Sequence, residues 1–129
     1  MSQILKYLLL EGNYAVYRSL GECTFDSAVQ MIDEALAYCK ANDIRGLLVD
    51  VTGVTGVPPP SISQRFQFAT QWALTAGGRV FLSMVAPAEL IDSDHIGVTM
   101  ANNRGLRSEV FSSEPEARKW LQGVCDKVG

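Results

Sequence analysis

A short apolar run in the first half of the chain constrains the fold more than any other feature. Residues 46–51 read Gly-Leu-Leu-Val-Asp-Val, and only Asp50 interrupts the apolar character, close to the end of the run. Nearly continuous apolar strands are typical of parallel sheets with helices on both faces, because neither row of side chains meets water. The run therefore predicts a central strand in a sheet that is covered on both sides.

The segment after this run is predicted to leave the sheet. It contains two Val-Thr-Gly steps and then Pro58, Pro59 and Pro60. Proline has no backbone N–H to offer a central strand, so we expect a loop from Thr52 onward. Residues 61–64, Ser-Ile-Ser-Gln, match a capping box, which predicts a helix that runs to Ala76 and ends at the following glycines.

This predicted helix is apolar on more than one side. The residues expected to face the core are Ile62, Phe66, Ala69, Ala73 and Ala76. Phe68 and Trp72 form an i, i+4 pair beside that stripe. Three interpretations of the pair are open: it widens the core contact, it lines a homodimer interface, or it lines a groove for an apolar ligand. We place core packing first.

Strand-like and helix-like segments alternate along the rest of the chain. The expected strands cover 4–10, 14–20, 79–85 and 107–111, and the expected helices cover 25–40, a region from Pro87 to Gly105, and a segment after a capping box at 113–116. Gly12 and Asn13 suit a tight turn, so the first two strands form a hairpin. We predict a single-domain α/β fold over 1–129, with a mixed, mostly parallel sheet of about five strands and about four helices.

Composition excludes several classes of protein. The 129 residues are 47% apolar and 19% charged, with a net charge of −3, which is typical of a globular domain and unsuited to nucleic-acid binding. Neither a signal peptide nor a membrane-spanning segment is apparent, so we expect a cytoplasmic protein. Cys23, Cys39 and Cys125 are odd in number and widely spaced, which favours reduced, packed thiols over disulfides or a metal site.

Two stretches resemble a known family. Residues 47–55, Leu-Leu-Val-Asp-Val-Thr-Gly-Val-Thr, resemble the strand and loop of the STAS domains of sulfate transporters and anti-sigma-factor antagonists, and 105–111 with 116–121 resemble the closing strand and helix of that family. The similarity extends from about Tyr14 onward and includes poorly characterised relatives grouped with SEC14-type lipid-binding folds. The resemblance implies a STAS-like fold and a regulatory domain that acts through a protein partner.

One family element is not carried over. In the antagonists, a serine at the start of the helix is phosphorylated to release the partner. The corresponding position in this chain falls near Pro58, Pro59 and Pro60, which cannot accept phosphate. Ser61 is the next hydroxyl, but the spacing does not place it at the site of the family, and phosphorylation of Ser61 or Ser63 is left open.

The candidate site is expected at the carboxyl ends of the strands, where open α/β sheets bind ligands. Its residues are Asp50, Thr52, Thr55, Ser61, Ser63, Arg65, Phe68 and Trp72. They suggest a pocket for a polar or anionic group, or a docking surface for a partner. A simpler interpretation, which we favour, is that Ser61 and Gln64 only cap a helix and Asp50 bonds loop amides.

No catalytic group, metal site or cofactor is predicted. The glycines of the 53–56 segment lack a following Gly-Lys-Ser/Thr, so a nucleotide loop is not indicated. His95 lies near Asp92 and Asp94, but its spacing with Ile91 and Val98 places it on a packing face.

Our first hypothesis is therefore a non-enzymatic module that uses residues 52–60 and the helix after them to bind a protein. The second is a carrier or sensor of a lipid or other small ligand, and an enzyme using His95 comes last.

Overall fold

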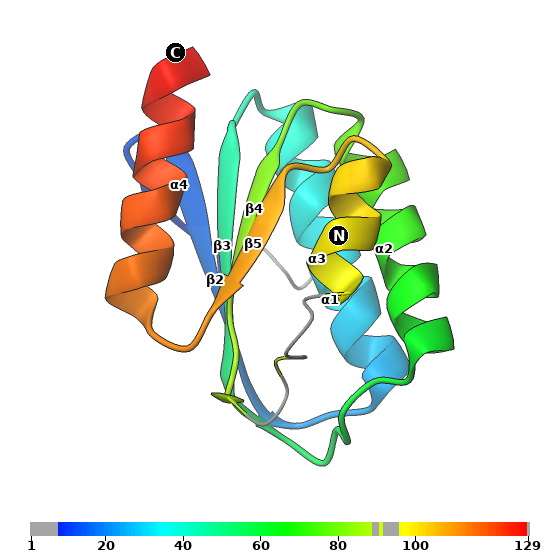
Figure 1. Ribbon diagram of the computed structural model, residues 1–129. Helices are drawn as coiled ribbons and strands as arrows, with labels where there is room; N and C mark the ends of the chain where they lie inside the picture. The colour runs from blue at the N-terminus through cyan, green and yellow to red at the C-terminus, as the bar shows by residue number, and fades with distance from the viewer. Residues whose placement is uncertain (1–7, 89–90, 92–95, 129) are drawn as a thin grey trace.

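The chain folds into a sheet with helices on both faces. The computed structural model describes residues 8–88, 91 and 96–128. The strands within these residues are β1 (Leu8–Glu11), β2 (Tyr14–Glu22), β3 (Gly46–Thr55), β4 (Phe81–Val85) and β5 (Ser108–Phe111). The helices are α1 (Phe25–Ala41), α2 (Ile62–Ala76), α3 (Ile96–Asn103) and α4 (Glu114–Val128). Figure 1 shows α1, α2 and α3 on one face of the sheet and α4 on the other.

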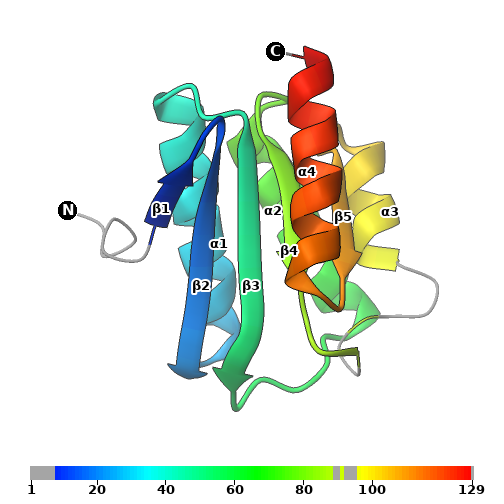
Figure 2. The same cartoon turned by 90° about the vertical axis from the view of Figure 1, so that its left-hand side faces the viewer.

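The sheet order confirms the predicted fold class. The five described strands lie in the order β1-β2-β3-β4-β5, with β1 antiparallel to β2 and every other pair parallel. β3 is therefore the middle strand, and residues 46–49 are buried as predicted. Figure 2 shows α4 in front of β4 and β5, with β1 and β2 to its side.

The prediction that the chain leaves the sheet at Thr52 is wrong. β3 continues to Thr55, because β2 is long enough to pair with it to the end. After a register shift between Arg18 and Leu20, β2 pairs Leu20 with Gly53 and Glu22 with Thr55. The Val-Thr steps suit a strand, and the prolines act only further along, from Pro58 onward.

The predicted core stripe of α2 is partly wrong. Ile62 is 62% exposed and Phe66 is 47% exposed, whereas Trp72 is 4% exposed. The indole N–H of Trp72 donates a hydrogen bond of 3.1 Å to the carbonyl of Val29 on α1. The helix is thus turned so that Trp72 and the small residues Ala69, Ala73 and Ala76 face inward. Burying a tryptophan whose N–H is hydrogen-bonded stabilises the fold more than burying an isoleucine at the end of the helix would.

Alternating side chains of the strands divide the core into two parts. Ala15, Tyr17, Leu47 and Val49 pack with the helices α1 and α2. Their neighbours along the same strands, Tyr14, Val16 and Leu48, pack instead with residues of α4 such as Ala117, Leu121 and Val124. This period of two is the pattern of a strand that is buried on both faces.

Some predicted features lie outside the described residues. These are His95 with Asp92 and Asp94, and the first residues of the opening strand before Leu8. The described part of the hairpin agrees with the prediction, since Gly12 has a φ of +68° at the turn.

The start of β3 requires a glycine because α4 lies very close to it. A Cβ atom at Gly46 would lie 2.7 Å from Sγ of Cys125 and 3.0 Å from a methyl group of Leu121. We expect Gly46→Ala to lower the free energy of unfolding by about 1–3 kcal/mol, as overpacking does in tight cores. Urea unfolding followed by circular dichroism measures this change.

Gly123→Ala is the matched control for that substitution. Gly123 lies in α4, and a Cβ atom there would meet nothing within 4 Å. Alanine favours a helix over glycine by up to about 1 kcal/mol, so this variant should be slightly stabilised. Equal effects of the two substitutions would contradict the close packing of α4 on β3.

Candidate functional site

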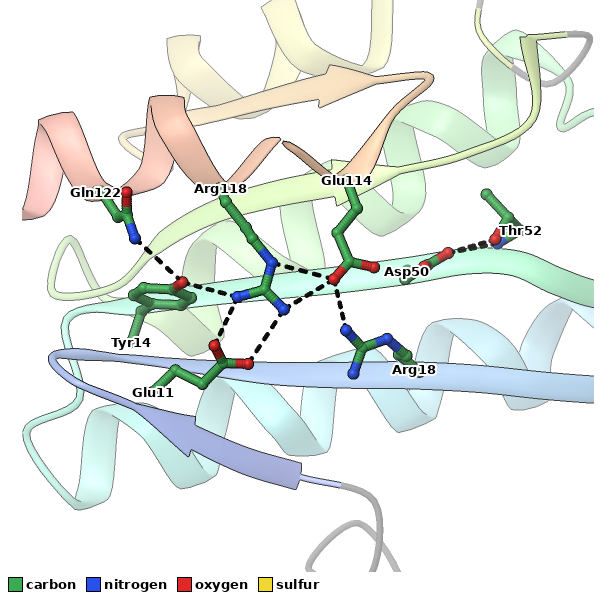
Figure 3. A network of polar contacts seen from close by, with 8 residues as sticks. All are labelled: Glu11, Tyr14, Arg18, Asp50, Thr52, Glu114, Arg118 and Gln122. Carbon is green, nitrogen blue, oxygen red and sulfur yellow. Dashed lines mark hydrogen bonds and ion pairs between the residues drawn. The ribbon is translucent and has the colours of Figure 1, made fainter. Parts of the chain in front are cut away.

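The side chains of Asp50 and Thr52 are bonded to each other within β3. The Oδ1 atom of Asp50 accepts hydrogen bonds from the backbone N–H of Thr52 at 2.9 Å and from its hydroxyl at 2.6 Å. Both side chains lie on the face of the sheet that α4 covers (Figure 3). Thr55 is exposed at the end of β3, where its carbonyl accepts from the N–H of Cys23 at 3.2 Å.

Ser61 caps α2 as the sequence predicted. Its hydroxyl accepts from the N–H of Gln64 at 3.1 Å, and the Gln64 side chain accepts from the N–H of Ser61 at 2.9 Å. Ser63 is exposed in the first turn. Nε of Arg65 donates to the carbonyl of Pro60 at 3.2 Å and so fastens the proline segment to the helix.

The predicted site residues therefore divide between two faces of the sheet. Arg65, Phe68 and Trp72 line a cavity on the face covered by α1, α2 and α3. Asp50 and Thr52 lie on the opposite face, next to the start of α4. The predicted residues therefore do not form one common pocket.

The cavity is apolar and has a volume of about 160 Å³. The rings of Phe68 and Trp72 stack within its wall, with centroids 4.5 Å apart. Leu82 and Met84 of β4 line it from the sheet, and Val57, Pro58 and Pro60 line it from the segment before α2. Arg65 and Glu109 are the charged residues among the described part of the lining, and Glu109 belongs to the strand row that includes Ser83, on the α4 side.

Ser108 is a cavity residue that the sequence analysis did not identify. It is 7% exposed, and its Oγ atom has no hydrogen-bond partner among the described residues. Its backbone N–H and carbonyl are both bonded by the Asn102 side chain, at 3.4 and 3.1 Å. A serine at the first position of a short strand gave no sequence signal, because such positions are often exposed.

A network of charged side chains joins α4 to the opening hairpin, and the sequence analysis missed it as well. Arg118 donates to both carboxylate oxygens of Glu11, at 2.6 and 3.1 Å, and to the Tyr14 hydroxyl at 3.0 Å. Glu114 accepts from Arg118 at 2.8 Å and from Arg18 (Figure 3). The network fixes β1, β2 and α4 relative to one another.

These contacts shift the pKa values of both carboxylates in the same direction. The hydrogen bond from Arg118 lowers the pKa of Glu11 below its ordinary value of 4.5. Partial burial raises the pKa of Glu114, but the hydrogen bonds from Arg118 and Arg18 outweigh it, and the pKa is lowered overall. Both groups are therefore ionised and paired at neutral pH.

Two of the cysteines are unreactive by environment. Burial raises the pKa of the Cys39 thiol to about 12 and also raises that of Cys125. Since the thiolate is the nucleophile, neither cysteine suits nucleophilic catalysis at neutral pH.

Across residues 8–88, 91 and 96–128, no group of three or more His, Cys, Asp or Glu side chains could hold a metal ion. No helix in that part of the chain is both long and apolar enough to span a bilayer.

Comparison with known proteins identifies the fold. No protein-family model matches the sequence, and no curated protein matches it. An anti-sigma factor antagonist from Mycobacterium paratuberculosis superposes with a TM-score of 0.58 at 12% identity, over 89% of this chain and 91% of that one. The chain has a STAS-like fold.

A second solved structure supports the same conclusion. It is an uncharacterized protein with a SpoIIAA-like fold from Shewanella loihica, with a TM-score of 0.51 at 16% identity. The match covers 88% of this chain and 90% of that one. The expectation from residues 47–55 is thus confirmed for the architecture, and identities this low extend to the fold alone.

The charged network predicts an acid-sensitive contribution to stability. Because the pKa values of Glu11 and Glu114 are lowered in the folded state, their contribution is present above about pH 4.5 and is lost as the pH falls through the folded-state values. We expect Arg118→Gln to lower the urea midpoint at pH 7 and to have much less effect at pH 3. A destabilisation that is the same at both pH values would contradict this role. Lys119→Gln, at the exposed neighbouring position, is the matched control.

Proposed function

We propose that the chain is a non-enzymatic regulatory module that binds a protein partner through the outer side of α2 and the segment before it. One observation carries the proposal. Ile62 and Phe66 are 62% and 47% exposed and lie one turn apart on α2. Leu74 is 76% exposed and lies roughly a quarter turn round the helix from Phe66, so the three form an oblique row along the exposed part of α2. Single exposed apolar residues are common, but a row of them on one helix is typical of a docking surface.

The geometry around this row supports the proposal. The capping box and the bond from Arg65 to Pro60 hold the segment before α2 in a defined position. The guanidinium of Arg104 lies over the Phe66 ring, 4.5 Å from its centroid, and contacts it by a cation–π interaction. A preorganised surface binds a partner at a smaller entropic cost than a mobile one.

The comparison proteins add support of a different kind. One structural neighbour is an anti-sigma factor antagonist, and this description favours a regulatory role that depends on another protein. The phosphoserine switch of such proteins is not part of the proposal, because prolines occupy positions 58–60. The partner is either a different protein or a second copy of this chain, which would form a homodimer.

Removal of the exposed row tests this function. We expect Ile62→Ser combined with Leu74→Ser to leave the free energy of unfolding within about 1 kcal/mol of the parent, since both side chains are exposed. The same variant should lose at least about tenfold in affinity for the co-purified partner, or dissociate a dimer, because apolar anchors dominate such contacts. Light scattering gives the mass in solution, and a pull-down with quantitative mass spectrometry gives the partner.

Leu9→Ser is the control, because Leu9 is 55% exposed on β1, at the edge of the sheet. It should retain the association. A parent protein that is monomeric and without a partner, or a double variant that behaves like the parent, would overturn the proposal. Trp72→Ala is not a suitable probe of the surface, because Trp72 is buried.

A second candidate function is favoured by the cavity. A carrier or sensor of a small apolar molecule needs a concave apolar site, and the stacked Phe68 and Trp72 rings form part of one. We expect native mass spectrometry of freshly purified protein to show a bound small molecule that organic extraction recovers. Ala28→Leu, which places a larger side chain in the lining, should reduce the bound fraction several-fold. Protein that is repeatedly empty would count against this candidate.

A further inference from the structure

The most unusual atom in the cavity is the Oγ of Ser108. The residue is more than nine-tenths buried, and Oγ has no hydrogen-bond partner in the described part of the chain. Buried hydroxyls are nearly always bonded, because an unpaired one loses its contacts with water and receives nothing in return. An unpaired hydroxyl in the wall of a cavity therefore offers a hydrogen bond to whatever occupies the cavity.

A second buried serine shows the contrast. Ser83 lies on the neighbouring strand β4 and is fully buried, but on the opposite face of the sheet. Its hydroxyl donates to the carbonyl of Ala117 at 3.0 Å. The fold thus satisfies the serine that packs under α4, while the serine that lines the cavity has its hydroxyl directed to no described polar group.

The size of the cavity limits what can bind. Its volume of about 160 Å³ is similar to that of an engineered apolar cavity of about 150 Å³ that binds benzene. A single aromatic ring or a short branched alkyl group fits this space. The walls around it are rings and aliphatic side chains such as Phe25, Phe68, Trp72 and Ile32.

The charge of the lining limits the ligand further. Among the described residues, Arg65 is the charged side chain on the cavity side, because Glu109 pairs with Ser83 of β4, whose side chain packs under α4. Nε of Arg65 is already bonded to the carbonyl of Pro60, and a Glu109 carboxylate oxygen accepts from the N–H of Val110 at 3.1 Å. A neutral ligand matches this mostly apolar lining better than an anion, because an anion buried among rings and aliphatic side chains loses its hydration.

We propose that the cavity binds a neutral molecule about the size of one ring that carries a single hydrogen-bonding group, and that Ser108 Oγ bonds this group. Phenols and small aromatic alcohols are the ligand class. The proposal rests on the second candidate function, since it names the ligand class of that cavity. It is independent of the protein contact made by the outer side of α2.

The test uses 4-fluorophenol and fluorobenzene, which differ by the hydroxyl group. Fluorine NMR titrations give the affinity of each probe for the parent and for Ser108→Ala. We expect Ser108→Ala to weaken 4-fluorophenol about fivefold, the loss of roughly one neutral hydrogen bond, and to change fluorobenzene less than about twofold. Ser83→Ala should leave both affinities unchanged, because that hydroxyl lies on the other face.

Folding does not confound this comparison. Replacing an unpaired buried hydroxyl with a methyl group is nearly neutral for stability or favourable, so Ser108→Ala should unfold at a urea midpoint at or above that of the parent. Ala28→Leu should weaken the binding of both probes, which would show that they bind in the cavity. This variant separates binding in the cavity from binding at the surface.

Two results would overturn the proposal, and they have different consequences. If both probes bind and Ser108→Ala weakens them equally or not at all, the role of Ser108 is wrong while the cavity is still a binding site. If neither probe binds the parent, the cavity is not a ligand site, and the second candidate function fails as well.

Discussion

Burial of β3 on both faces is the constraint on which the rest of the structure depends. Its backbone pairs with β2 along its length and with β4 from Gly46 to Asp50, so the first half of the strand has a neighbour on each side. Leu47 and Val49 point to one layer of helices, and Leu48 points to α4. Gly46 lets α4 come close to the start of the strand. The opposite layer, formed by α1, α2 and α3, leaves a cavity against the sheet.

This division places the candidate functions on separate parts of the molecule. The oblique row of Ile62, Phe66 and Leu74 is exposed on α2, whereas Trp72 on the same helix lines the cavity. α2 is therefore the element that connects the two sites, and a ligand beside Trp72 would lie against the helix that presents Phe66 to a partner. The charged network around Arg118 lies on the other face and serves to hold β1, β2 and α4 together.

Local signals in the sequence predicted much of the fold, and contacts between distant residues account for what they missed. The apolar run at 46–51 predicted the central strand, and Ser61 with Gln64 predicted the start of α2, because each signal is complete within a few residues. The extension of β3 to Thr55 depends on the register of β2, and the rotation of α2 depends on the carbonyl of Val29. The bond between Arg118 and Glu11 joins residues 107 positions apart, and the unpaired state of Ser108 is visible only once α3 and β5 are packed. No local pattern encodes these contacts.

The central claim is that the outer side of α2 is the surface through which the protein acts. Oxidative footprinting of side chains, on the isolated protein and on its purified complex or dimer, measures this most directly. The account predicts that Phe66, Ile62 and Leu74 lose reactivity in the assembly, while Trp120 on α4 keeps the reactivity that it has in the isolated protein. Protection of Trp120 or of Leu9 on β1, with the α2 row unchanged, would contradict it.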